Sequence, residues 1–240
     1  MDAGTETSVE GLAISSVKRV PVRRLLHLEI DELESALMSL GALVDDALTR
    51  AVAAVVERDG TAAQGVAEGD SALNHLQLRI REHCYHILRT QAPVACDLRN
   101  VLAVMQMAAE LERIGDHCVS IARETLALCN LPENFATHRR ADIGELGRLC
   151  AVQLRDILGA ILRRDAAAAR AVAVGDDTVD RAYHAAVNRL LQAMRLSPHT
   201  APTATHLLFV AHCLERIGDR ITNLAEDLVY LDSGVITELG

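Results

Sequence analysis

The chain has 240 residues, half of them hydrophobic, with only three tyrosines, two phenylalanines and no tryptophan, and its formal net charge is −9. This acidic balance argues against a nucleic-acid partner, because phosphates need a basic surface. No uncharged apolar run reaches about 18 residues, so the sequence predicts no membrane span. The six cysteines form no C-x-x-C motif, which favours reduced thiols in a cytoplasmic protein.

The apolar residues are mainly leucine, alanine, valine and isoleucine, and few stretches alternate with a period of two. This pattern predicts an all-α fold. Residues 1–22 are polar and aperiodic and are expected to form a mobile leader. Apolar residues at helical spacing then predict a first helix over about 24–58, which ends at Asp59-Gly60.

Two further helices follow in the first half of the chain. Thr61 and Gln64 have the spacing of a capping box, which predicts the start of a second helix that runs to about residue 89. Asp97 is expected to be the N-cap of a third helix that reaches about residue 129. The sequence Leu131-Pro132-Glu133-Asn134 then breaks the pattern.

The same pattern begins again after this break. A shift of 106 residues superposes Gly69-Asp70 on Gly175-Asp176, and a shift of 103 superposes Glu112-Arg113-Ile114-Gly115-Asp116 on the identical pentapeptide at 215–219. A shift that changes only at a loop indicates an internal duplication. The sequence therefore predicts two tandem three-helix bundles with six long helices, and assigns residues 23–131 and 132–240 to the two domains.

Each copy carries acidic or amide side chains four residues apart on its second and third helices, and we call these pairs the acid steps. At that spacing two side chains share one helix face, and like charges repel. Each step has a glycine next to an acid, which suggests that two helices approach closely there. The predicted ligands are Asp70, Asn74, Glu112 and Asp116 in the first copy, and Asp176, Asp180, Glu215 and Asp219 in the second, with Asn223 and Glu226 further along the last helix.

An oxygen-only ligand set of this kind suits hard or borderline cations such as Mg, Ca, Mn or iron. The alternative is that the acids are solvated and pair locally with Arg113 and Arg216. Because the arrangement recurs four times, we favour metal binding for the set as a whole.

These motifs resemble the PhoU family. The stretch Gln91-Ala92-Pro93-Val94-Ala95-Cys96-Asp97-Leu98-Arg99 is similar to the family's Q-P-x-A-x-D-L-R segment, and residues 217–226 are similar to its I-G-D-H-x-x-N-I-A-E segment. Departures are Asn74 in place of an acid, Ser120 in place of an asparagine, and Arg220 in place of the usual histidine. The resemblance covers about residues 25–232.

The resemblance implies a PhoU-type, spectrin-repeat-like helical fold and a cytoplasmic, homodimeric, non-enzymatic regulator. Such a protein would couple a phosphate ABC transporter ATPase to a sensor histidine kinase and repress the phosphate-starvation response. The resemblance also implies multinuclear iron or zinc clusters on the acid steps. Two alternatives stay open at this point: a carboxylate-bridged di-metal oxidase, although the chain has no Glu-x-x-His step, and a helical adaptor without metal.

Overall fold

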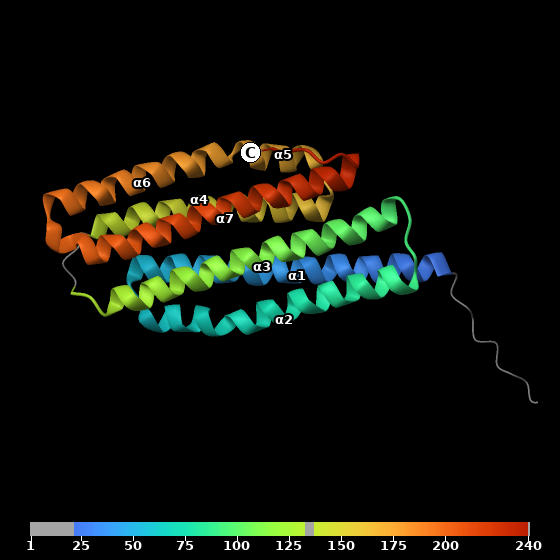
Figure 1. The fold of residues 1–240 in the computed structure, drawn as a ribbon, viewed down its shortest axis with the longest axis horizontal. Helices are drawn as coiled ribbons and strands as arrows, with labels where there is room; N and C mark the ends of the chain where they lie inside the picture. The colour runs from blue at the N-terminus through green and yellow to red at the C-terminus, as the bar shows by residue number, and fades with distance from the viewer. Residues whose placement is uncertain (1–21, 133–136, 240) are drawn as a thin grey trace, which may run out of the picture.

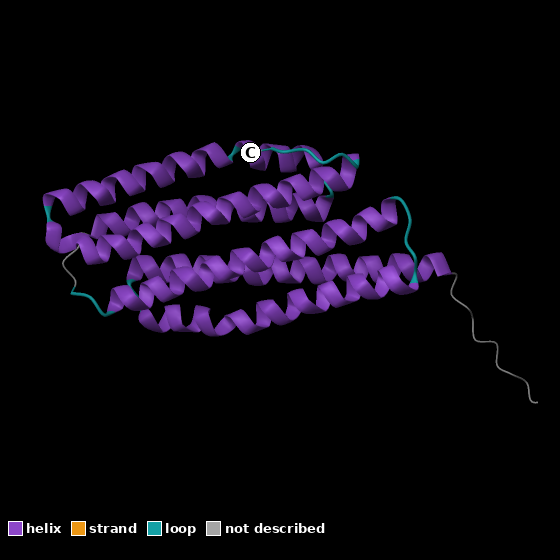
Figure 2. Cartoon of the chain, in the orientation of Figure 1, coloured by secondary structure: helices purple, strands orange, loops and turns teal. Residues whose placement is uncertain are grey.

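The computed structural model describes residues 22–132 and 137–239. These residues form α-helices joined by short connections, and the described part of the chain contains no strand (Figure 2). The predicted all-α fold is confirmed. The predicted leader lies outside the described residues except for Val22, where the first helix begins. The elements are α1 (Val22–Glu57), α2 (Gly60–Thr90), α3 (Cys96–Cys129), α4 (Thr137–Arg163), α5 (Ala166–Val174), α6 (Asp176–Leu196), the 3₁₀ turn η1 (Pro198–Thr200) and α7 (Ala201–Ser233).

The helices form two three-helix bundles that lie side by side along their length (Figure 1). The first contains α1, α2 and α3, and the second contains α4, α7 and the interrupted pair α5 and α6. Helix α3 packs along α7, and α1 packs along α4. These partners are equivalent helices of the duplicated unit, so each copy contacts the other through matching elements, while α2 and α6 lie on opposite outer sides (Figure 1).

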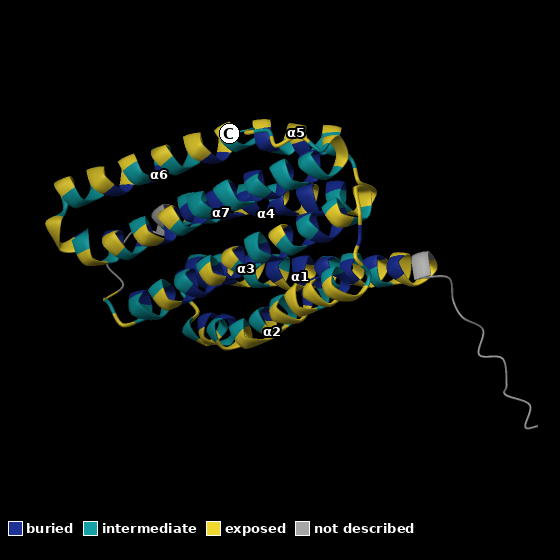
Figure 3. Cartoon of the chain, turned by 45° about the vertical axis from the view of Figure 1, so that its right-hand side comes forward, coloured by how far each residue is buried: buried dark blue, intermediate teal, exposed yellow. Residues whose placement is uncertain are grey.

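The core is a continuous set of buried leucine, isoleucine, valine and alanine side chains that runs through both bundles. The buried side chains of α1, α3, α4 and α7 face one another, and exposed residues lie mainly on the outer surfaces (Figure 3). No helix among the described residues is long and apolar enough to cross a membrane.

Aspartate side chains set the start of the second helix in each copy. The Asp59 carboxylate accepts hydrogen bonds from the backbone N–H groups of Thr61 and Ala62, at 2.8 and 3.0 Å. Asp165 accepts one from Ala168 at 2.9 Å. The predicted capping box at Thr61 is therefore wrong, because Asp59 is the N-cap and Thr61 already lies inside the first turn of α2, while the Gln64 side chain donates to Glu68.

Two other helix boundaries differ from the prediction. Asp97 lies inside the first turn of α3, and the N-cap is Ala95, at φ 48°, with no side-chain hydrogen bond. The second helix of the second copy is interrupted at Gly175, which ends α5 and precedes Asp176, the first residue of α6.

Candidate functional site

The acid step on α2 faces the one on α3 in the first bundle. The Asn74 Nδ2 group donates to Asp70 Oδ2 at 3.0 Å, and the remaining side-chain oxygen of each residue is buried with no hydrogen-bond partner in the described structure. Burial raises the pKa of Glu112, and the carboxylates of Asp116 and Asp70 add to the rise, while Arg113 opposes it. Because the charge of Asp70 on α2 raises the pKa of Glu112 on α3, the two acid steps lie close enough to interact electrostatically.

The acid steps of α6 and α7 also lie close together. Burial is the main cause that raises the pKa of Asp176 to about 6, and the carboxylates of Asp180, Asp219 and Glu215 raise it further. A hydrogen bond from Thr222 partly offsets these effects. Burial, Asp219 and Asp180 also raise the pKa of Glu215. The four carboxylates predicted for the second copy therefore lie near one another and repel.

Two of the four glycines allow the close helix approach that the sequence suggested. A Cβ atom on Gly218 would lie 2.9 Å from Asp176 Oδ1, and one on Gly115 would lie 3.0 Å from Leu73 Cδ1. The suggestion is wrong for Gly69, where no atom lies within 4 Å of an added Cβ. It is also wrong for Gly175, which separates α5 from α6 and faces its own helix and α4.

Asn223 and Glu226 have other partners than the acid steps. The Asn223 amide donates to Glu110 Oε2 on α3 at 3.1 Å, and Arg220 contacts the same oxygen at 3.3 Å. Glu226 accepts the backbone N–H of Leu239 at 2.8 Å. These residues join α7 to the other bundle and to the end of the chain, and the structure does not group them with Asp176.

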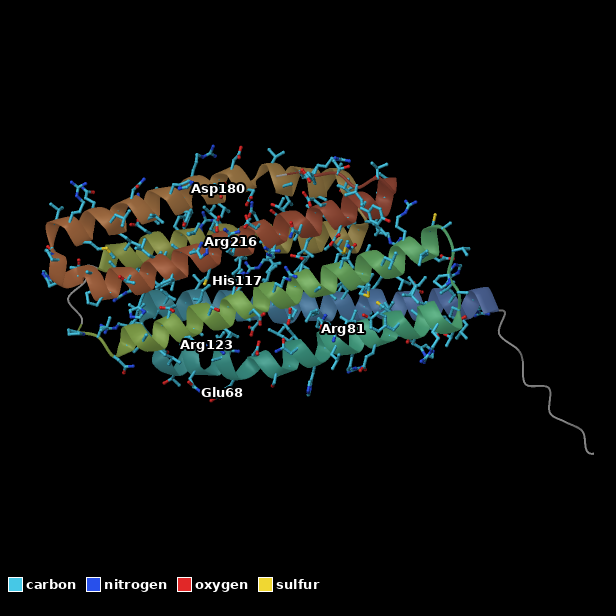
Figure 4. All side chains as sticks on the ribbon, viewed as in Figure 1. Glu68, Arg81, His117, Arg123, Asp180 and Arg216 are labelled. Carbon is cyan, nitrogen blue, oxygen red and sulfur yellow. The ribbon has the colours of Figure 1, made fainter. Side chains whose placement is uncertain are left out.

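A positively charged side chain, Arg216, also contacts two acids of the second copy. Arg216 lies 2.9 Å from Asp219 Oδ2 and 3.3 Å from Glu215 Oε2. On the other side of α7, burial lowers the pKa of His117 of α3, and so do the charges of Arg220, His212 and Arg216. Figure 4 shows Asp180 on α6, Arg216 on α7 and His117 at the seam between α3 and α7.

The donor types fit a cation, but the side chains are not closed around one point. No three histidine, cysteine, aspartate or glutamate side chains among the described residues converge closely enough to hold an ion. The buried, unpartnered oxygens of Asp70 and Asn74, and the mutual repulsion around Asp176, are nevertheless the features that a cation would relieve. All six cysteines are free.

Sequence reasoning missed the polar contacts that join the two bundles. One is the ion pair between Glu110 and Arg220, and another links His206 Nδ1 to Glu124 Oε2 at 2.6 Å. Helical periodicity places these residues at the edge of the apolar faces. Only the packing of α3 on α7 shows that the partners meet, and no pattern along the chain carries that information.

The fold and the acid steps together define a duplicated helical-bundle protein with carboxylate clusters between its helices. The sequence model of the PhoU domain matches residues 37–125 and again 143–228. The chain belongs to the PhoU family.

Relatives and solved structures agree with this assignment. The chain is 33% identical over 213 residues to a phosphate-specific transport system accessory protein PhoU homolog of Pseudomonas putida, with 89% of this chain and 82% of that protein covered. It is 32% identical over 218 residues to a homolog of Streptococcus pneumoniae TIGR4, with 91% and 100% covered.

The crystal structure of the phosphate transport system regulatory protein PhoU from Streptococcus pneumoniae matches with a TM-score of 0.83 at 32% identity, covering 89% of this chain and all of that one. The crystal structure of PhoU from Pseudomonas aeruginosa matches equally well, with a TM-score of 0.83 at 32% identity over 88% of this chain and all of that one. These relatives are named as accessory and regulatory proteins and not as enzymes, which confirms the non-enzymatic prediction.

Proposed function

We propose that this chain is an accessory regulator of phosphate transport that represses the phosphate-starvation response when phosphate is plentiful. It acts as a cytoplasmic homodimer and couples a phosphate ABC transporter ATPase to a sensor histidine kinase. The observation that carries the proposal is the match of both halves to the PhoU domain, together with full-length similarity to proteins named for phosphate-specific transport.

We further propose that the acid steps hold metal ions, in multinuclear clusters of iron or zinc, or with Mg, Ca or Mn in their place. A bound cation would supply the positive charge that the clustered carboxylates lack. In the second copy Asp176, Asp180, Glu215 and Asp219 would hold it, and Arg216 would have to release two of them. In the first copy Asp70, Glu112 and Asp116 would act with the neutral amide of Asn74.

The two alternatives predict different results. A metal-free adaptor draws support from Arg216, which already contacts Glu215 and Asp219. A di-metal oxidase would consume oxygen when the protein is supplied with ferrous iron. Elemental analysis of protein purified without chelator separates the metal-free adaptor from the two metal-binding functions, and oxygen consumption separates the oxidase from the regulator.

Deletion of the gene tests the regulatory role. We expect alkaline phosphatase and phosphate-uptake genes to be expressed in high phosphate, and the full-length gene to restore repression. Normal repression in the deletion strain, with no paralogue present, would refute the proposed role.

Two matched double variants test the metal ligands. Affinity for a hard cation rises with the number of charged oxygen ligands, so Glu215→Ala with Asp219→Ala is expected to lose more metal than Glu112→Ala with Asp116→Ala. Equal loss would contradict this ranking of the two copies. Metal retained by the protein with all four substitutions would exclude these residues as ligands, and would leave the regulatory proposal standing.

A further inference from the structure

A cavity of about 280 Å³ opens on the seam between the two bundles, between α1 and α3 of the first and α4 and α7 of the second. Leu37, Val104 and Met107 are buried in its walls. Met38, Ile161, Leu162 and Leu231 complete the apolar lining. Methionine side chains adapt to different shapes, so these walls suit a small apolar body. No residue of the acid steps lines this cavity.

One buried hydrogen-bond acceptor in the lining, the side-chain oxygen of Asn100, has no partner in the described structure. Asn100 is only 8% exposed, and its Nδ2 group donates to Glu34 Oε1 at 2.9 Å. A carboxylate only accepts hydrogen bonds, so this contact fixes which amide atom is nitrogen. The other atom, Asn100 Oδ1, is buried without a hydrogen-bond partner in the described structure. An unpartnered buried acceptor is costly, and a ligand that donates to it would remove that cost.

The charges around the cavity are already balanced. Arg164 forms an ion pair with Glu34 through the same oxygen that Asn100 contacts. A carboxylate ligand would meet Glu34, and an ammonium ligand would meet Arg164 with no free anion to pair with. Both would leave a charge poorly compensated in an apolar site.

We propose that this cavity binds a small aliphatic molecule that ends in an uncharged hydrogen-bond donor, such as an alcohol or a primary amide. The chain of the ligand lies against Met38, Val104 and Met107, and its donor bonds to Asn100 Oδ1. The proposal goes beyond the regulatory function and does not depend on it.

The duplicated half shows how this site diverged. In the second copy Arg140 stands at the position of Glu34 and Gly144 at that of Met38. The Arg140 Nε group donates to the carbonyl oxygen of Val56 at 3.2 Å. A Cβ on Gly144 would lie 2.9 Å from Val56 Cγ2, so the Val56 side chain occupies the equivalent space. Two lining residues of the cavity, Glu34 and Met38, are therefore replaced in the second copy, where Val56 lies in the equivalent space.

Methionine methyl groups provide direct reporters of binding. Full-length protein labelled with ¹³C at the methionine methyl groups is titrated with 1-hexanol and followed by NMR. We expect saturable shifts at Met38 and Met107, and none at Met194 on α6. Hexyl methyl ether has a similar apolar chain but no donor, so it should bind about tenfold more weakly than the alcohol. Hexanoate and hexylamine should bind more weakly than the alcohol too.

A substitution of the acceptor then isolates its role. Asn100→Leu should remove the preference for the alcohol over the ether, while Met194→Leu, as the matched control, should keep it. The ligand series on the wild-type protein tests the proposal even if Asn100→Leu does not fold. Absence of saturable shifts at Met38 and Met107 would overturn the proposal, as would equal affinity for alcohol and ether or tighter binding of hexanoate or hexylamine.

Discussion

The close packing of α7 on α6 can be measured with a pair of glycine substitutions. Gly69 on α2 and Gly218 on α7 each come directly before an aspartate of an acid step, and both lie inside helices. Nothing lies within 4 Å of a Cβ added to Gly69. A Cβ added to Gly218 would lie 2.9 Å from Asp176 Oδ1 and 3.3 Å from Val179 Cγ1. The two sites therefore share the intrinsic gain from alanine and differ in the space available.

The expected magnitudes follow from this difference. Alanine stabilises a helix interior by about 1 kcal/mol relative to glycine, so Gly69→Ala should raise the melting temperature by about 2–4 °C for a chain of this size. At Gly218 the same gain is opposed by an overpacking cost of about 1–3 kcal/mol. Gly218→Ala should therefore lie between no change and a loss of about 2 kcal/mol.

Both variants are compared with the wild type by thermal unfolding in the presence of a chelator, so that metal does not contribute. A stabilisation of Gly218→Ala equal to that of Gly69→Ala would refute the close approach of α6 to α7. A structure of Gly218→Ala in which the Asp176 carboxylate keeps its position would refute it as well.

Three further predictions concern caps and buried acids. Asp59→Ala removes the acceptor for two N–H groups of α2 and should lower the free energy of unfolding by about 1 kcal/mol, whereas Thr61→Ala should have little effect. Thermal unfolding compares the two variants, and an equal loss of stability in both would favour the capping box at Thr61 after all. The raised pKa of Asp176, about 6 against an ordinary 3.8, means that the folded protein disfavours the ionised form, so stability should fall as the pH rises from about 4 past 6. In chelator, Asp176→Asn should unfold at a higher temperature than wild type at pH 8 and show a flatter pH profile, and an unchanged profile would contradict the assignment. Burial and the charges of Glu110 and Glu226 raise the pKa of Asp227 to about 7, so Glu110→Gln should lower it in a ¹³C carboxyl titration, and an unchanged value would exclude the coupling.

Most of the fold follows from patterns within the chain. Helical periodicity located α1, α2 and α3 to within a few residues, because the spacing of apolar residues in an amphipathic helix reflects its buried face. At the end of α7, Gly234 adopts the left-handed conformation that a helix C-cap often requires, at φ 72°. The duplication supplied the second bundle without any further signal.

Other features depend on contacts between distant residues. The interruption at Gly175 was not predicted, because an isolated glycine is tolerated within many helices. The left-handed backbones of Arg58 and Arg164, at φ 58° and 53°, were not predicted either, since arginine rarely adopts this conformation. Arg58 there donates to the carbonyl oxygens of Leu128 and Leu131, a long-range contact that no local pattern records.

The candidate site divides in the same way. The spacing of the acids placed the two members of each step on one helix face, and the structure brings Glu112 near Asp70 and Glu215 near Asp180 between adjacent helices. The spacing did not distinguish Asn223 from the acids of the step, although Asn223, on the same helix as Glu215, donates to Glu110 of the other bundle. Helical spacing identifies residues on one helix, but it does not state which neighbour each of them faces.

The arrangement of the two copies allows their acid steps to differ. Helices α1 and α3 pack against their own counterparts, α4 and α7, so substitutions along that seam must be accommodated by both copies at once. The acid steps lie in the outer grooves, where α2 covers α3 and α6 covers α7. A change there, such as Asn74 in place of the acid found at Asp180, affects one groove and leaves the seam intact. The geometry thus allows one copy to carry three carboxylates in its acid steps while the other carries four, and this independence is the physical basis for the proposed inequality in metal affinity.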